Sequence, residues 1–98
     1  MISGFQWDEG NWPKCAKHGV SREEIEALFA SEILAVHPTW DEGAEEERFL
    51  AIGVGPQERW LFVIFTLREI AGKTLIRPIS ARYMHKKEVE HYEQQKDT

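Results

Sequence analysis

At residues 60–82 the chain reads WLFVIFTLREIAGKTLIRPISAR, which is two apolar runs joined by a short turn. Both runs are rich in β-branched and aromatic residues, so we predict antiparallel strands at Arg59–Thr66 and Thr74–Ser80, with Ala71-Gly72-Lys73 as the turn. Pro78 cannot donate a hydrogen bond to a neighbouring strand, which favours an edge position or a bulge. The other elements are therefore expected to pack against this hairpin.

Two more strands are predicted before the hairpin. Ile33–Val36 and Arg48–Val54 are short apolar runs, and His37-Pro38 is expected to end the first of them. Gly55-Pro56-Gln57-Glu58 has the composition of a hairpin turn, whereas the acidic segment Asp41–Glu47 is expected to form an exposed turn. Connections this short imply that the four strands form an antiparallel meander.

Helices are predicted before the meander in the chain and after it. The capping-box spacing of Ser21 and Glu24 indicates a helix over Ser21–Ser31, preceded by a short helix from Pro13 to Ala16. A polar helix over Ala81–Gln95 closes the chain. The predicted fold is thus α+β, with two N-terminal helices, a four-stranded antiparallel meander and a C-terminal helix. Ahead of them, Phe5 and Trp7 form a short strand or an anchoring segment.

Length and composition indicate one domain over residues 1–98. Of the 98 residues 42% are hydrophobic, and four Trp and five Phe supply large groups for a core. The lone Cys15 cannot form an internal disulfide, and no Cys/His cluster has zinc-ligand spacing, so no metal or other cofactor is expected. No signal-peptide pattern opens the chain and no apolar run approaches the roughly 20 residues of a membrane span. We expect a cytoplasmic protein without membrane contact.

Charge is divided unevenly along the chain. The formal net charge is −5, which argues against a general nucleic-acid binder. Residues 1–59 carry five basic and twelve acidic side chains, a net of −7, whereas residues 60–98 carry seven basic and five acidic side chains, a net of +2. The C-terminal part can therefore present a local cationic site, while the acidic part discourages indiscriminate binding or attracts a basic partner.

Three arginines of this C-terminal part are the main candidates for phosphate binding. The predicted strands bring Arg68, Arg77 and Arg82 near the ends of neighbouring elements. A guanidinium group is always charged and can bind two oxygens at once, which suits RNA or another polyanion. The alternative is that these arginines lie on solvated faces or pair with Glu69 and Glu88.

A second cationic cluster consists of Lys14, Lys17 and His18 on the short helix. A histidine titrates near neutrality, so His18 is a candidate general acid or base. It also lies just before Gly19, a position from which a histidine caps helix carbonyls, and this structural role is the alternative.

Two aromatic residues are candidates for contact with RNA. They are Trp7, because it lies close in sequence to the Lys14–His18 helix, and Tyr83; for both, packing in the core is the alternative. His85, Glu88 and His91 lack the spacing of a zinc motif and are expected on a solvated helix face.

These landmarks resemble the BrnT toxin family of type II toxin–antitoxin systems, which has a RelE-like ribonuclease fold. The matching pieces span nearly the whole chain. They are Phe5-x-Trp7-Asp8, Lys17-His18-Gly19-Val20, the helix after Ser21, Glu47-Arg48-Phe49 with Ile52-Gly53, Phe65-Thr66-x-Arg68, and Ile76–Arg82 with Glu88 and Tyr92.

The resemblance implies an endoribonuclease that suppresses translation and is neutralised by a BrnA-like antitoxin, which would carry the DNA-binding module of the pair. Its substrate would be RNA, with association with translating ribosomes left open. Metal-independent cleavage needs a base, an acid and fixed cations. Two alternatives remain: a RelE-like binding module that keeps only the antitoxin contact, and a metal-dependent enzyme that uses His85 and Glu88.

Overall fold

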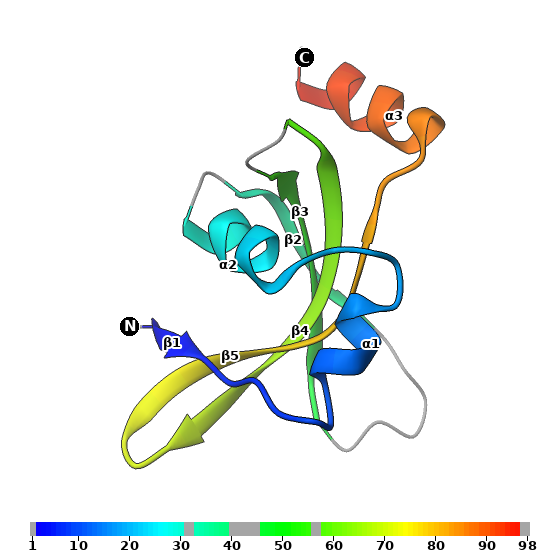
Figure 1. Ribbon diagram of the computed structural model, residues 1–98. Helices are drawn as coiled ribbons and strands as arrows, with labels where there is room; N and C mark the ends of the chain where they lie inside the picture. The colour runs from blue at the N-terminus through cyan, green and yellow to red at the C-terminus, as the bar shows by residue number, and fades with distance from the viewer. Residues whose placement is uncertain (1, 31–32, 40–45, 56–57, 97–98) are drawn as a thin grey trace.

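One five-stranded sheet organises the chain in the computed structural model, which describes residues 2–30, 33–39, 46–55 and 58–96 (Figure 1). Three helices accompany the sheet, so the α+β prediction is confirmed. In chain order the elements are β1 (Ile2–Phe5), α1 (Trp12–Ala16), α2 (Arg22–Ala30), β2 (Ile33–Thr39), β3 (Arg48–Val54), β4 (Trp60–Ile70), β5 (Lys73–Tyr83) and α3 (Lys86–Lys96).

The strands lie in the order β1-β5-β4-β3-β2. β2 to β5 form the predicted antiparallel meander, but β1 pairs in parallel with the first part of β5. The prediction of a four-stranded, purely antiparallel sheet is therefore wrong, although the short strand expected as one alternative around Phe5 is present as β1. Without β1, the beginning of β5 would expose unpaired backbone groups along its outer edge. A parallel strand is joined to its partner by a long crossover connection, so no turn motif in the sequence predicts the pairing.

The two strands of the central hairpin are longer than predicted. β4 continues to Ile70 and β5 continues to Tyr83, each over 11 residues. The predicted helix over Ala81–Gln95 is therefore wrong at its start, and α3 begins at Lys86. The last residues of β5 pair with β4, and Ala81 is only 3% exposed. Burial against the neighbouring strand thus outweighs the helical propensity of this segment.

Both strand prolines occupy tolerated positions. The register between β4 and β5 shifts around Ile79, next to Pro78, so the bulge, one of the two alternatives predicted for Pro78, is confirmed. β2 runs through His37-Pro38 to Thr39, and the predicted end of this strand at His37-Pro38 is wrong. β2 is the last strand in the sheet order, and an edge strand tolerates a proline.

Some predicted connections lie partly outside the described residues. Only residues 46–47 of the acidic segment Asp41–Glu47, and only Gly55 and Glu58 of the Gly55–Glu58 turn, are described, and Ser31 of the predicted helix is not. The turn at Ala71 and Gly72 is confirmed, with φ angles of 52° and 78°. Glycine adopts this left-handed conformation without strain, which suits it to a tight turn.

The hydrophobic core lies between α2 and one face of the sheet (Figure 1). Phe29 of α2 packs edge-on against Phe5 at 5.8 Å and against Phe65 at 5.0 Å between ring centroids. The predicted capping box starts the helix: Glu24 N donates to Ser21 Oγ at 3.1 Å, and Ser21 N donates to the Glu24 carboxylate at 3.2 Å. Side chains fully buried in this core include Ile25, Leu28, Leu61 and Val63.

Asn11 attaches the segment between β1 and α1 to the sheet. Its side chain is 1% exposed, and its Nδ2 donates to the backbone oxygens of Gln6 at 2.9 Å and Pro78 at 2.8 Å. Its Oδ1 accepts a hydrogen bond from the backbone N–H of Asp8 at 2.8 Å. One buried amide therefore satisfies three backbone groups and holds α1 beside β5.

We predict that Asn11→Ala lowers the free energy of unfolding by about 2–3 kcal/mol, because buried backbone groups lose their partners. Urea unfolding measures this loss. Gln94→Ala, which removes an exposed amide from α3, is the control and should change stability by less than about 0.5 kcal/mol. Equal stability of the two variants would contradict this role of Asn11.

Candidate functional site

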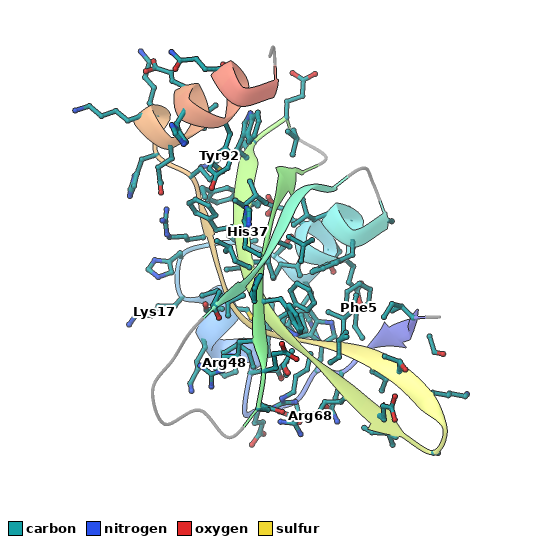
Figure 2. The ribbon with its side chains drawn as sticks, turned by 180° about the vertical axis from the view of Figure 1, so that it is seen from behind. Phe5, Lys17, His37, Arg48, Arg68 and Tyr92 are labelled. Atoms are coloured by element: carbon teal, nitrogen blue, oxygen red, sulfur yellow. The ribbon has the colours of Figure 1, made fainter. Side chains whose placement is uncertain are left out.

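The sheet face opposite α2 carries a hollow of about 240 Å³, here called the open-face hollow. Strand register aligns Leu50, Ile64 and Ser80 across β3, β4 and β5, and side-chain alternation directs them to this face. The connection between α1 and α2 contributes His18. Figure 2 shows the molecule from the opposite side to Figure 1, with Lys17 after α1, His37 of β2 and Arg48 of β3 labelled. The lining consists of His18, Leu50, Phe62, Ile64, Ser80, Ala81 and Arg82.

Arg82 is the cation of the open-face hollow. Its Nη1 and Nη2 each lie 2.9 Å from one carboxylate oxygen of Glu88, and its Cζ lies 4.4 Å from the centroid of the Phe62 ring. The two side chains of the ion pair are 39% and 30% exposed. Hydrogen bonds from Arg82 and from the backbone N–H of His85 lower the pKa of Glu88 to about 2. The alternative expectation, that Arg82 pairs with Glu88, is therefore confirmed.

Arg77 is occupied by the segment that precedes α1. Its guanidinium binds both Asp8 carboxylate oxygens at 2.9 and 3.0 Å and Gln6 Oε1 at 3.1 Å, and its side chain is 12% exposed. These hydrogen bonds from Arg77 lower the pKa of Asp8. A Cβ at Gly10 would lie 3.0 Å from Arg77 Nη2 and from Asp8 Oδ1, so a larger residue there would require this ion pair to shift by a few tenths of an ångström. Arg77 thus holds a loop in place.

Arg68 lies farther along β4 and forms an ion pair with Glu46 at 2.9 Å, not with Glu69. The register makes Arg68 and Arg77 diagonal neighbours, whereas Arg82 lies five residues beyond Arg77 in β5. At roughly 3.3 Å per residue, this spacing separates Arg77 from Arg82 by about 16 Å. The structure therefore gives each arginine a separate carboxylate partner and does not gather the three around one point.

The Lys14–His18 cluster is divided between two places. Lys14 and Lys17 are exposed on and just after α1, and only His18 lines the open-face hollow. The structure therefore brings together His18 and Arg82, one candidate from each cationic cluster, with Lys17 next to His18 in the chain.

Trp7 and Tyr83 lie away from the hollow. Trp7 is half-buried, packs edge-on against Trp12 at 5.5 Å between ring centroids, and donates its Nε1–H to Glu26 at 3.2 Å. The Tyr83 hydroxyl contacts both Glu24 carboxylate oxygens, at 2.9 and 2.8 Å, near the start of α2. Burial and this contact raise the pKa of Tyr83.

Sequence reasoning missed Ser80 and Phe62 as lining residues of the hollow. Both lie on the same strand face as Arg82, because residues two apart in a strand point the same way and Phe62 is the cross-strand partner of Arg82. The period-2 alternation was available in the sequence. It could not be applied to Arg82 while the segment from Ala81 onward was expected to be helical.

No group of three or more His, Cys, Asp or Glu side chains that could hold a metal ion is found among the described residues. Cys15 is buried, and burial raises its pKa to about 11. Within the described part of the chain, no helix is long and apolar enough to cross a membrane.

Fold and hollow together define a small α+β protein with a histidine and an arginine on an open sheet face, a combination suited to a phosphodiester ligand. A family model described as "Ribonuclease toxin, BrnT, of type II toxin-antitoxin system" matches residues 7–88. The chain therefore belongs to the BrnT family of ribonuclease toxins, as the resemblance indicated. A search of curated proteins finds no match.

We predict that the Glu88 carboxyl titrates near pH 2 in the folded protein and returns toward about 4.5 in Arg82→Gln. The pKa of Glu88 is lowered on folding, so the ion pair stabilises the folded state above about pH 4.5, and this contribution disappears as the pH falls toward 2. Carboxyl-carbon NMR measures both values. Arg59→Gln, which removes an arginine stacked on Tyr83, is the control and should leave Glu88 unchanged.

Proposed function

We propose that this chain is a metal-independent endoribonuclease that inhibits translation by cleaving RNA in the open-face hollow. The observation that carries the proposal is that His18 and Arg82 line one concave surface. A titratable group and a fixed cation are what phosphodiester cleavage requires. Membership of the BrnT family supports RNA as the substrate.

The proposed reaction needs no bound cofactor. The ribose 2′-oxygen attacks the adjacent phosphorus, the bond to the 5′-oxygen of the next nucleotide breaks, and a 2′,3′-cyclic phosphate and a 5′-hydroxyl result. One proton leaves the 2′-hydroxyl and one proton reaches the departing oxygen. Negative charge grows on the phosphoryl oxygens, so a nearby guanidinium stabilises the transition state more than the substrate.

We assign proton transfer to His18 and contact with the phosphoryl oxygens to Arg82. Lys17, exposed next to His18 in the chain, is assigned to the RNA backbone beside the cleaved bond. Lys14 and Trp7 lie outside the hollow and are assigned to more distant parts of the RNA. Arg77 and Arg68 support the site indirectly, because their guanidinium groups hold Asp8 and Glu46.

The antitoxin in this proposal is BrnA-like and blocks RNA from the open-face hollow. The acidic residues 1–59, with a net charge of −7, favour a partner with basic segments. DNA contact is assigned to the antitoxin, because the toxin itself has a net charge of −5.

A second candidate function is a catalytically silent module that binds only the antitoxin. The observation that favours it is that Arg68, Arg77 and Arg82 each already bind a carboxylate. An arginine that stays paired contributes little to phosphate binding. The two functions therefore differ in whether the chain cleaves RNA, and the ribonuclease function requires Arg82 for that cleavage.

We predict that induced expression of the chain arrests bacterial growth and fragments RNA, and that Arg82→Ala abolishes both effects. Arg59→Ala is the matched control: this arginine also stacks on an aromatic ring, at 3.3 Å from the Tyr83 centroid, but it does not line the hollow. Growth curves and total RNA integrity are the measurements. Normal growth at confirmed folded expression would support the silent module, whereas equal arrest by Arg82→Ala would contradict the role assigned to Arg82.

We predict that His18→Gln lowers RNA cleavage by the purified protein about 100-fold or more, the usual contribution of a general acid or base. His85→Gln, which changes an exposed histidine outside the hollow, should keep activity within about twofold. A chelator should leave the wild-type rate unchanged. Loss of activity on chelation, with recovery on adding a divalent metal, would contradict the metal-independent reaction.

A further inference from the structure

Glu88 already occupies an anion position at the edge of the open-face hollow. Three donors converge on its carboxylate at 2.9 Å each: Arg82 Nη1, Arg82 Nη2 and the backbone N–H of His85. A phosphate group presents the same charge sign and the same pair of oxygens to a guanidinium fork. The carboxylate therefore stands where a phosphate bound by Arg82 would have to lie.

The helix that carries Glu88, α3, packs weakly against the sheet. No side chain at residues 86–94 of α3 is buried, and the helix lies at one end of the sheet (Figure 1). Its contacts with the sheet include the Arg82–Glu88 ion pair and the edge-on packing of Tyr92 on Phe62 at 6.4 Å. Both sheet residues line the hollow, so α3 can lift from this end without exposing a buried core.

We propose that Glu88 is a specificity-determining residue: it competes with RNA phosphate for Arg82, and RNA binds productively only when Glu88 and α3 are displaced. This inference rests on the proposed function, because it concerns the same arginine. A ligand with several phosphates can displace the carboxylate through added contacts, with Lys17 for example. A single inorganic phosphate lacks those contacts, so competition by Glu88 favours binding of a polyanionic chain over small phosphates.

Competition between Glu88 and RNA phosphate also explains why Arg82 is paired with a carboxylate, the observation that favours a catalytically silent module. An exposed ion pair contributes at most about 1 kcal/mol, which corresponds to roughly a fivefold change in an equilibrium constant. Such a pair lowers the affinity for phosphate without abolishing it. Arg82 is therefore shielded from incidental anions and remains available to a ligand that makes several contacts.

The test compares Glu88→Gln with Glu90→Gln. Glutamine at position 88 can still accept the hydrogen bond from the His85 N–H, so the start of α3 is preserved while the charge is lost. Glu90 is an exposed residue of the same helix, and its substitution removes an equal charge from elsewhere on α3. The probe is a short 2′-O-methyl oligoribonucleotide, which cannot be cleaved by its own 2′-oxygen, and fluorescence anisotropy measures its Kd.

We expect Glu88→Gln to tighten binding about three- to fivefold and Glu90→Gln to change it less than twofold. Adding Arg82→Gln to Glu88→Gln should remove the gain. Tyr92→Ala, which loosens α3 and leaves Glu88 intact, should also tighten binding, so the inference stays testable if Glu88→Gln folds poorly. Equal effects of the two glutamate substitutions, a gain that persists without Arg82, or no binding by any variant would overturn it.

The outcomes also separate this inference from the proposed function. RNA cleavage that depends on Arg82, combined with unchanged binding in Glu88→Gln and Tyr92→Ala, would overturn the inference and leave the ribonuclease standing. Tighter, Arg82-dependent binding without any cleavage of ordinary RNA would support the competition and overturn the catalytic proposal.

Discussion

The pairing of β4 with β5 is the constraint on which the rest of the structure depends. The two strands pair from Leu61 and Tyr83 at one end to Ile70 and Lys73 at the other, with one bulge. This pairing sets which side chains face α2 and which face the open side. It also creates a long outer edge on β5, and β1 and the Asn11 side chain cover that edge. The two faces and the edge therefore follow from one hairpin.

Charge compensation is the second organising feature. The chain is acidic overall, and its three candidate arginines each bind a carboxylate from a different segment: Asp8 before α1, Glu46 before β3 and Glu88 in α3. Two of these ion pairs fasten connecting segments to the sheet. The third ion pair attaches the polar helix α3 to the rim of the hollow. Ion pairs of one type therefore support the structure in two places and occupy the candidate arginine in the third.

Much of the fold could be predicted from local patterns. The capping box of Ser21 and Glu24, the strand Arg48–Val54, the turn at Gly72 and the bulge near Pro78 are all local, because each depends on residues close together in the chain. The parallel pairing of β1 with β5 and the continuation of β5 to Tyr83 could not be predicted from local patterns. Both depend on partners far away in sequence, whose pairing outweighs local propensity.

The candidate site shows the same division. Arg82, His18 and the pairing with Glu88 were all identified as possibilities from residue type and spacing. The separation of Arg77 and Arg68 from Arg82 was not predicted. The expectation that these arginines lie close together in a hairpin does not reveal which carboxylate binds which guanidinium. Ser80 and Phe62 were missed for a related reason: their direction follows from the strand assignment of β5.

The sequence by itself determined the α+β class, the meander, the family and the residue types available for phosphodiester chemistry, because these depend on composition, periodicity and motifs. Only the tertiary structure decided that β1 completes the sheet, that His18 and Arg82 line the same hollow, and that Glu88 binds the Arg82 guanidinium. Such contacts join segments far apart in the chain, and their geometry arises only when the sheet is assembled.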